Sequence, residues 1–540
     1  MAELQHGSPR ALATLATCSL NQWALDFDGN LERVLESIRQ ARAAGARYRL
    51  GPELELPGYG CEDHFYEPDT LLHSWQSLAA ILRSGLTDGI LCDIGSLALH
   101  KSVRYNVRIL CLNGRVLLVR PKLSLADDGN YREGRWFVPW CESRGIEELV
   151  LPDFVQHAAG GQRTVPIGFA ALEFDDASAG AETCEELFTP DAPHIALALD
   201  GVEVIANGSG SHHELRKLDR RLQLLRSATA KAGGVYLYAN QQGCDGGRCY
   251  YDGCALVVVN GEVVAQGTQF SLRDVEVVVA TVDLEAVRSA RAAFVSRSHQ
   301  AAAARAVPRV RAELALCLPR AEAVRAAPAQ PLLPFVHPPE EEIAYGPACW
   351  LWDYLRRSGA SGFFLPLSGG ADSSSTAAIV GCMCQLLLEA IQSGKAPGPP
   401  HARGVRAPAP DASVLADLRR VTKSADDWTP SSASEIANLI LHTCYMATSN
   451  SGNETRERAA ALSGEVGAYH VSSLIEPMVR GTLEVFATFA KRAPRYRDAG
   501  GSVAEDVALQ NIQARLRMLA PWVRGREGFL LVLGSANVDE

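Results

Sequence analysis

An apolar run that passes through a Ser/Gly loop into a helix constrains the second half of this chain more than any other feature. Residues 363–367 are mostly apolar, the eight residues from Ser368 read Ser-Gly-Gly-Ala-Asp-Ser-Ser-Ser, and residues 376–391 carry apolar side chains at helical spacing. A strand, a glycine loop and a helix N-terminus together present backbone N–H groups to an anion. The alternative is a Ser/Gly turn that only caps a helix. We therefore expect an α/β layer with phosphate bound where the helix begins.

The same loop contains one carboxylate, Asp372. Carboxylate and phosphate oxygens are the ligands that Mg²⁺ prefers, so Asp372 is suited to hold the metal beside a pyrophosphate. No lysine follows the second glycine. The loop is therefore not of the Gly-x-x-x-x-Gly-Lys kind.

The length of the chain, 540 residues, is too great for one ordinary core, so we expect two or three domains. Its composition, 47% hydrophobic and 21% charged, is that of a globular protein. The net charge of -10 argues against a general nucleic-acid binder, which would be basic. The basic cluster Arg216-Lys217 and Arg220-Arg221 is interpreted as a solvated helix face.

The N-terminal residues lack the apolar core of a signal peptide, and no apolar run reaches the length of a membrane span. The 14 cysteines show no paired metal-binding spacing. They are typical of reduced thiols, which predicts a cytoplasmic protein with no membrane partner.

The first half of the chain shows the alternation of a layered α/β domain. The pattern predicts a strand over 12–18, a helix capped by Asp28, a second strand ending near Glu53 and a third over 90–99. Two Asn-Gly pairs, Asn113-Gly114 and Asn260-Gly261, lie between apolar runs and predict hairpins, because both turn positions must accept positive φ.

The composition changes after the first 300 residues. We expect a first domain over 1–300, a linker or arm over 301–339, and a second domain over 340–540. The Pro/Gly/Ala-rich stretch 394–411 is interpreted as a disordered insert in the second domain.

Cys184 is the candidate nucleophile of the first domain. It stands in Thr-Cys-Glu-Glu-Leu-Phe-Thr-Pro, where the pattern predicts an elbow after a strand. A reactive cysteine needs a base or a positive neighbour, and Glu53 and Lys122 stand at two other predicted strand ends. Glu53 would take the thiol proton and Lys122 would stabilise the oxyanion. Each residue alone is more often structural, and Glu55, expected on the same face as Glu53, is a rival base.

Three ordered motifs resemble the nitrilase/amidase family with its Glu-Lys-Cys triad. They are Pro-Glu-Leu with Gly-Tyr around Glu53, Arg-Pro-Lys with Tyr-Arg-Glu around Lys122, and Cys-Glu-Glu-Leu at Cys184. The resemblance implies an α-β-β-α sandwich. It also implies that Glu133 supports the lysine, and that the amide substrate, glutamine, is held by Tyr131, Glu185, Phe188 and Ser211.

The Ser-Gly-Gly-x-Asp-Ser loop resembles the pyrophosphatase loop of N-type adenylating enzymes, which have a doubly wound, Rossmann-like parallel sheet. The two halves together are similar to the family of glutamine-dependent NAD⁺ synthetases. This resemblance implies ATP-dependent amidation of deamido-NAD⁺, with ammonia from glutamine and release of AMP, pyrophosphate and glutamate. The implied ATP-binding residues are Pro366, Leu367, Ser368, Gly369, Gly370, Ala371, Asp372, Ser373 and Ser535, with Ser368 also catalytic.

Further roles come from the same resemblance. Asn511, Arg515 and Glu540 would bind deamido-NAD⁺, Asp372 and Glu540 would hold Mg²⁺, and the chain would form a homo-oligomer acting on small molecules. The family motif continues past Glu540, so the C-terminal part of the nucleotide domain is expected to be missing. The alternative is a glutaminase whose synthetase half is crippled.

Overall fold

The computed structural model describes residues 11–393, 410–448, 451–519 and 528–535. The chain divides into two compact units, one ending at Gly346 and the other beginning at Pro347. The helix α9 (Pro339–Ser358) contains this boundary. Each unit is described separately below.

The first unit is built on two layers of β-strands joined through one long strand, β1 (Leu12–Leu20). On one side of β1 the order is β2 (Tyr48–Leu50), β3 (Leu91–His100), β4 (Val103–Leu112), β5 (Arg115–Pro121), β7 (Thr164–Ile167) and β6 (Glu147–Val150). On the other side it is β11 (Val235–Gly243), β10 (Val204–Ser209), β9 (Ser178–Thr183), β8 (Ala171–Glu173) and β16 (Arg309–Arg311). β15 (Val275–Asp283) pairs with β1, and β12 (Tyr251–Asp252), β13 (Leu256–Val259) and β14 (Glu262–Gln266) complete the β11 side.

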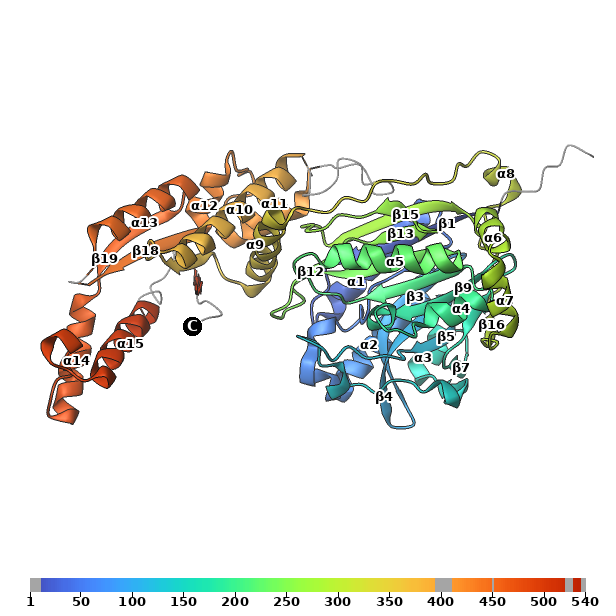
Figure 1. The fold of residues 1–540 in the computed structure, drawn as a ribbon, viewed down its shortest axis with the longest axis horizontal. Helices are drawn as coiled ribbons and strands as arrows, with labels where there is room; N and C mark the ends of the chain where they lie inside the picture. Colours follow the sequence, from blue (N-terminus) through green and yellow to red (C-terminus); the bar gives the residue numbers. More distant parts are fainter. Residues whose placement is uncertain (1–10, 394–409, 449–450, 520–527, 536–540) are drawn as a thin grey trace, which may run out of the picture. The chain divides into compact units, whose positions relative to one another are not determined.

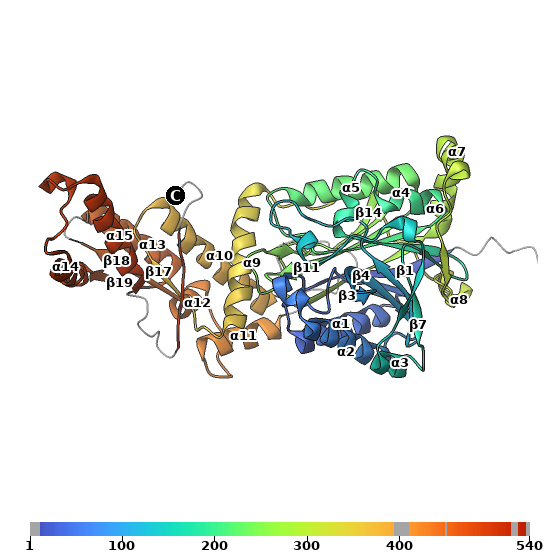
Figure 2. The same cartoon turned by 90° about the horizontal axis from the view of Figure 1, so that it is seen from below.

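Helices cover both outer faces of these strands (Figures 1 and 2). One face carries α1 (Phe27–Ala43), α2 (Pro68–Arg83) and α3 (Asp153–Ala158), and the other carries α4 (Pro193–Leu199) and α5 (Lys217–Ala232). The helices α6 (Leu284–Ala292), α7 (Val295–Ala303) and α8 (Arg320–Ala323) follow β15.

Three apolar clusters confirm the predicted α-β-β-α sandwich. The central cluster joins strand residues from both layers, including Leu15, Leu110 and Leu237. The outer clusters lie under α1–α3 and under α4 and α5. Successive side chains of a strand point to opposite faces, so Leu15 belongs to the central cluster and Ala16 to an outer one. Two stacked sheets with helices outside bury all these faces.

Two local predictions have different outcomes. Both hairpins are confirmed: Asn113 and Gly114 (φ 51° and 69°) join β4 to β5, and Asn260 and Gly261 (φ 50° and 91°) join β13 to β14. The predicted cap of α1 is wrong. Asp26, not Asp28, accepts the backbone N–H of Gly29, because α1 begins at Phe27, two residues earlier than the predicted cap implied.

The segment that follows α7 packs along the first unit. Its strand β16 pairs in parallel with β8, and Ala312 and Leu316 are buried in the central cluster. The predicted insert, 394–411, lies almost entirely outside the described residues.

The second unit contains a parallel sheet in the order β19 (Tyr469–Leu474), β18 (Leu441–Ala447), β17 (Phe363–Pro366), β20 (Leu531–Val532). Its helices are α10 (Ala371–Ser393), α11 (Ala412–Thr422), α12 (Ala433–Ile440), α13 (Asn453–Val466), α14 (Glu476–Ala490) and α15 (Val503–Leu519). A parallel sheet with crossover helices is the predicted Rossmann-like arrangement.

Helix α10 corrects the prediction that no segment reaches the length of a membrane span. Among the described residues it is long and apolar enough to cross a membrane by length and composition, with mean hydropathy 1.5. It follows the Ser/Gly loop directly and packs against α11, α12 and α13. A helix packed in the core of a domain can pass this length and composition test without crossing a membrane.

Candidate active sites

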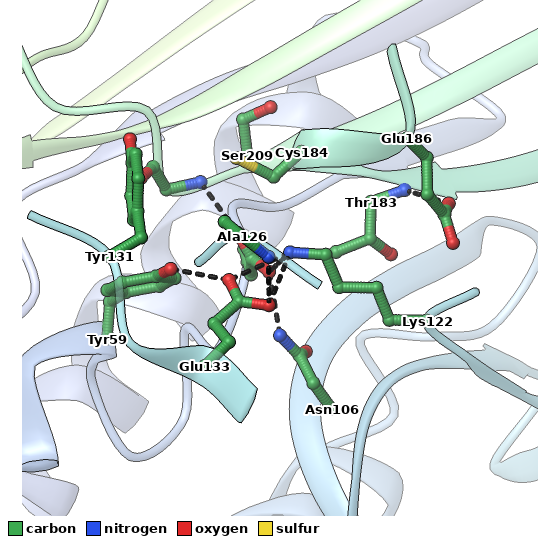
Figure 3. Close-up of polar contacts among 12 residues, drawn as sticks. Tyr59, Asn106, Lys122, Ala126, Tyr131, Glu133, Thr183, Cys184, Glu186 and Ser209 are labelled. Carbon is green, nitrogen blue, oxygen red and sulfur yellow. Dashed lines mark hydrogen bonds and ion pairs between the residues drawn. The ribbon is translucent and has the colours of Figure 1, made fainter. Parts of the chain in front are cut away.

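The side chain of Lys122 contacts two carboxyl groups in the first unit, and Figure 3 shows one of them, that of Glu133. Its Nζ is 2.6 Å from Oε1 of Glu53 and 2.8 Å from both carboxylate oxygens of Glu133. All three residues are buried. The geometry thus brings together the predicted base, the predicted cation and the predicted supporting carboxylate.

Glu53 is held in place through both of its carboxylate oxygens. Asn106 donates to Oε1 at 2.7 Å, and the backbone N–H of Gly210 donates to Oε2 at 3.1 Å. The backbone carbonyl of Pro52 accepts from the buried Arg108 at 2.7 Å. Glu53 therefore lies in a turn beyond β2 whose backbone and side chain are both fixed.

The rival base Glu55 is bound elsewhere. Its two oxygens accept from Arg49 at 2.8 and 2.7 Å, in an ion pair that is completely buried. The expectation that Glu53 and Glu55 lie on one face of a strand is wrong, because β2 ends at Leu50, before both residues. The intervening Leu54 has φ 50°, and the chain turns there.

Cys184 stands where β9 ends and a 3₁₀ turn, Cys184–Leu187, begins. Its φ of 41° is unusual for a residue with a side chain and marks a strained elbow. Glu186 connects this elbow to β5, the strand that ends just before Lys122: it accepts from Arg120 at 2.6 Å and from the backbone N–H of Thr183 at 2.7 Å. The predicted elbow is present, and the buried ion pair fixes it against β5.

The thiol of Cys184 is coupled electrostatically to the charged cluster. Burial raises its pKa well above the ordinary value, Glu53 raises it further, and Lys122 lowers it. Burial alone would lower the pKa of Lys122, but Glu133 and Glu53 raise it, so the lysine is a cation. Burial raises the pKa of Glu133 to about 7, against the opposing effect of Lys122. The resting thiol is therefore neutral and needs a base when it reacts.

Tyr59 and Tyr131 line a cavity of about 360 Å³ that lies beside this cluster. The hydroxyl of Tyr59 donates to Glu133 at 2.5 Å. The hydroxyl of Tyr131 donates to the carbonyl of Gly210 at 3.3 Å and accepts the N–H of His212 at 3.1 Å. Tyr59 thus links the lining of the cavity to the Lys122 cluster.

The other predicted glutamine-binding residues lie on either side of the elbow. Ser211 follows Gly210, and its buried hydroxyl has no hydrogen-bond partner within the described residues. Glu185 is half-buried, and burial raises the pKa of its carboxyl. Phe188 follows the 3₁₀ turn, with the Arg220 guanidinium 5.3 Å from its ring centre. Ser211 and Glu185 therefore offer polar atoms that a substrate could use.

Several residues that contact this site were not singled out from the sequence as functional. They are Tyr59, Asn106, Asn207 and Asn240. An asparagine inside an apolar strand was the available signal for three of them. Arg221 also overturns the interpretation of its basic cluster as solvated. It is fully buried and pairs with Asp252 of β12 at 2.5 Å, because it lies on the side of α5 that packs on the strands β11 and β13.

The Ser/Gly loop of the second unit joins β17 to α10 as predicted. Gly369 has φ 77°, and a Cβ there would lie 2.3 Å from the carbonyl of Thr455. The hydroxyls of Ser368 and Ser373 are 2.9 Å apart, and the N–H of Gly370 donates to Ser368 at 3.2 Å. Ser368 and Gly370 are exposed. The loop holds its shape through its own hydroxyls and leaves its outer surface open.

Asp372 is exposed in the first turn of α10, beside this loop. The described residues contain no group of three potential metal ligands, but Mg²⁺ commonly takes one or two carboxylates and completes its shell with phosphate and water. A single exposed carboxylate next to an open Ser/Gly loop fits that preference.

Ser535 lies at the same sheet edge as the loop. It follows β20, which pairs in parallel with β17, and the N–H of Leu533 donates to Phe364 at 2.8 Å. Asn511 and Arg515 are exposed on α15, four residues apart, and no contact recorded in the described part of the chain joins them to the loop. Glu540 lies outside the described residues.

Two family descriptions match the chain. Carbon-nitrogen hydrolase matches residues 14–292, and NAD synthase matches residues 347–540. The glutamine-dependent NAD(+) synthetase of Saccharomyces cerevisiae is 54% identical over 98% of this chain and 73% of its own length. The human protein of the same name is 51% identical over 98% of this chain and 73% of its own length. The chain belongs to the glutamine-dependent NAD(+) synthetase family.

Solved structures agree with this family on the fold. The glutamine-dependent NAD(+) synthetase of Cytophaga hutchinsonii matches with a TM-score of 0.71 and 23% identity, over 95% of this chain and 72% of that one. The enzyme of Acinetobacter baumannii, in complex with ADP, matches with a TM-score of 0.66 and 18% identity, over 98% of this chain and 75% of that one. Both units of the chain thus have the fold of this synthetase family.

Proposed function

We propose that the chain makes NAD⁺ from deamido-NAD⁺, ATP and glutamine; the names of its relatives state glutamine-dependent NAD(+) synthesis for them. The first unit would hydrolyse glutamine to glutamate and ammonia. The second would adenylate the nicotinate carboxylate and let ammonia displace AMP. The observation that carries the proposal is the joint presence of the buried Glu53–Lys122–Glu133 cluster at the Cys184 elbow and the open Ser/Gly loop, in a chain of this family.

The first half-reaction follows from the charges around Cys184. Glu53 takes the thiol proton, and the sulfur attacks the side-chain carbonyl carbon of glutamine. When the C–N bond breaks, the proton passes from Glu53 to the leaving nitrogen, and ammonia departs. Water, deprotonated by Glu53, then attacks the thioester; the C–S bond breaks, glutamate is released, and Glu53 returns the proton to the Cys184 sulfur. The raised pKa of the Cys184 thiol supports a base-assisted step rather than a resting thiolate.

The oxyanion of the tetrahedral intermediate needs a positive partner. The backbone N–H of Cys184 is already bonded to Oδ1 of Asn207 at 2.9 Å and is not free for this task. Lys122 is a cation fixed beside Glu53, which supports the role of oxyanion stabiliser. Glu133 would hold the side-chain ammonium group of Lys122 in place through its two 2.8 Å contacts.

The second half-reaction would use the loop at the end of β17. Backbone N–H groups from Ser368 to Ser373 would bind the phosphates of ATP, and Asp372 would hold Mg²⁺, which supplies charge neutralisation at the pyrophosphate. The deamido-NAD⁺ carboxylate would attack the α-phosphorus with release of pyrophosphate. Pro366, Leu367, Gly369, Ala371 and Ser535 would complete the ATP site, and Asn511, Arg515 and Glu540 the deamido-NAD⁺ site.

Three assignments of organisation belong to the same proposal. The glutaminase domain would cover 1–300, the arm 301–339 and the synthetase domain 340–540. The enzyme would act as a homo-oligomer. A cytoplasmic location is supported by the cysteines, since all 14 are free thiols, as in proteins of reducing compartments.

The test is an isotope experiment on the purified full chain. Deamido-NAD⁺, ATP and MgCl₂ are supplied with glutamine labelled with ¹⁵N at the side-chain amide, and NAD⁺, AMP and glutamate are quantified by mass spectrometry. We expect equal amounts of NAD⁺ and AMP, with the label in the carboxamide of NAD⁺. The synthetase assignment would be contradicted if glutamine gave glutamate but no NAD⁺, and if ammonium supplied in place of glutamine also gave no NAD⁺. Absence of glutamate would contradict the glutaminase assignment.

A further inference from the structure

The carboxamide of Asn207 is attached to the backbone of the nucleophile. Its Oδ1 accepts the N–H of Cys184 at 2.9 Å and the hydroxyl of Ser209 at 2.8 Å, and all three residues are buried. Cys184 is one residue past the last rung of the β9–β10 ladder, which ends at Thr183 paired with Gly208. Its N–H therefore finds no strand partner, and the Asn207 side chain provides the acceptor that a buried N–H requires.

The orientation of this carboxamide is fixed from its other end. Nδ2 of Asn207 donates to the hydroxyl oxygen of Tyr236 at 3.2 Å, and Tyr236 donates its own proton to Glu182. In the strand register Asn207 pairs with Glu182, and Tyr236 pairs with Ile205, so all of these side chains share the face covered by α4 and α5. If the Asn207 carboxamide were rotated by 180°, Nδ2 would face the Cys184 N–H. The bonds to the Cys184 N–H and to the Tyr236 hydroxyl would both be lost.

Glu182 is the fixed end of this chain of hydrogen bonds. It is fully buried and accepts both the backbone N–H and the Nδ1 of His194, the latter at 3.1 Å. Burial favours the neutral carboxyl, but His194 outweighs it, and the net pKa of Glu182 lies below its ordinary value. An ionised Glu182 can only accept hydrogen bonds, so the Tyr236 proton must point toward it. The Tyr236 oxygen is then left to accept from Asn207 Nδ2, and Oδ1 of Asn207 is turned toward the Cys184 N–H.

From this network we infer that Asn207 is a positioning residue for glutamine hydrolysis, acting through the backbone of Cys184. The inference rests on the proposed glutaminase function. Cys184 has φ 41°, a conformation that a non-glycine residue keeps only when its surroundings enforce it. Arg120–Glu186 fixes the elbow from the side that follows Cys184, and Asn207 fixes it at Cys184 itself. The two contacts together set the direction in which the sulfur leaves the chain.

The test separates positioning from ordinary stability. Asn207→Ala removes the acceptor, and Tyr236→Phe removes only the hydroxyl that orients Asn207. Thr229→Val is the matched control, because Thr229 is a buried residue whose side-chain oxygen accepts a backbone N–H, that of Gly261 at 2.9 Å, remote from the elbow. Each protein is assayed for glutamine kcat and KM, for thermal unfolding, and for inactivation by 6-diazo-5-oxo-L-norleucine, a diazoketone analogue of glutamine that alkylates a positioned thiol.

For Asn207→Ala we expect kcat and the limiting rate of inactivation to fall on the order of 100-fold, the usual cost of misplacing a reacting group by about 1 Å. KM and the inactivator concentration at half-maximal rate should change by less than about threefold, because substrate contacts are untouched. Tyr236→Phe should cause a smaller loss in the same two rates. Thr229→Val should lower the unfolding temperature and leave both rates within about twofold of the wild type.

Two outcomes would overturn the inference alone: Asn207→Ala and Tyr236→Phe with unchanged limiting rates, or a loss that appears only in KM. If Asn207→Ala does not fold, Tyr236→Phe gives the same decision. A wild-type protein that neither hydrolyses glutamine nor reacts with the diazoketone would refute the proposed function, and this failure is recognised before any variant is compared.

Discussion

The two candidate sites of this chain are built on opposite principles. Around Cys184 the charged groups are buried and already paired, with Lys122 bonded to Glu53 and Glu133. Around Ser368 the loop is exposed, and within the part of the chain that the structure describes the hydroxyls of Ser368 and Ser373 bond to each other and to the loop backbone. One site is complete without its substrate, whereas the other consists of donors that face outward.

The difference reflects the chemistry required of each site. A nucleophilic thiol must be held against a base and a cation before an uncharged amide arrives, because glutamine's amide brings no charge with which to organise the site. A nucleotide brings its own charges, and open N–H groups at a helix N-terminus are enough to bind them. Buried ion pairs are costly to assemble, and the pairs Lys122–Glu53 and Lys122–Glu133 place that cost where the chemistry needs fixed charges.

The largest expected effect separates the two sites completely. Cys184→Ala should lower glutamine hydrolysis at least roughly 10⁴-fold, because loss of the nucleophile removes the covalent route. NAD⁺ formation from ammonium should stay within about twofold of the wild type, since the second site does not use the thiol. Cys92→Ala, at another fully buried cysteine, is the control and should retain both activities. Loss of the ammonium-dependent reaction in Cys184→Ala would show that the sites are not separable.

A change in the loop should produce the reverse pattern. Gly369→Ala places a Cβ 2.3 Å from the Thr455 carbonyl at φ 77°, so the loop must move. NAD⁺ formation should fall roughly 100-fold with either nitrogen source, while glutamine hydrolysis assayed alone persists. Gly464→Ala, in α13 with open space around the new methyl group, is the matched control. Equal loss of both activities in Gly369→Ala would mean that the loop supports the whole chain.

The contrast also explains what the sequence could and could not predict. The elements around both sites were predictable because each has a local signal, such as Asn113-Gly114 for the hairpin that leads to Lys122. The partners of those residues were not, because they come from distant strands. Asn106 and Asn207 reach Glu53 and Cys184 across the sheet, and nothing in their local sequence specifies that register.

The errors arose because short stretches of sequence were interpreted one at a time. The choice of Asp28 as the cap of α1 and the solvated reading of Arg221 both relied on short-range pattern, whereas Asp252 on β12 determines where Arg221 points. The length of α10 was missed because only uninterrupted apolar runs were considered, whereas the helix also includes the polar residues at its start. Long-range pairing is the information that one sequence does not contain.

A third prediction concerns the pH dependence of the charged cluster. The pKa of Glu133 is raised to about 7, so this carboxyl ionises as the pH rises through that value. The added negative charge beside Lys122 should strengthen Glu53 as a base, and glutamine kcat should rise across the same interval. Glu133→Gln should flatten this rise and lower kcat roughly 10- to 100-fold, the rate equivalent of one lost hydrogen bond to a charged group.

Stability should change in the opposite sense over that range. The unfolded chain releases the Glu133 proton near the ordinary value of 4.5, and the folded chain releases it near 7, so the free energy of unfolding falls as pH rises between them. Glu276→Gln is the control, a buried carboxyl whose pKa is also raised by burial but which bonds the backbone of Thr268. It should alter stability and leave the pH profile of kcat unchanged. A rise in kcat through pH 7 that survives in Glu133→Gln would assign the titration to another group.

The last prediction concerns stability, and its expected effect on activity is the smallest. It tests whether a buried ion pair stabilises the fold of the first unit. Asp252 is fully buried. Burial raises its pKa, but Arg221 and His213 outweigh that effect and hold it below its ordinary value of 3.8. Because the folded pKa is the lower one, the stabilisation is present above pH 4 and is lost as the pH falls. Asp252→Asn should lower the free energy of unfolding at pH 7 by about 3 to 5 kcal/mol, the cost of a buried charge left without its partner.

Asp63 provides the matched comparison, because Arg135 and Trp136 hold its pKa low as well, but on the exposed surface. Asp63→Asn should change chemical denaturation much less than Asp252→Asn, since water screens the exposed pair. The gap between the two variants should narrow as denaturation is repeated toward pH 3, where protonation removes part of the Asp252 contribution from the wild type too. Equal losses at pH 7 would mean that burial adds nothing to these pairs. The contrast between a prepaired site and an open loop would then concern geometry alone and not energy.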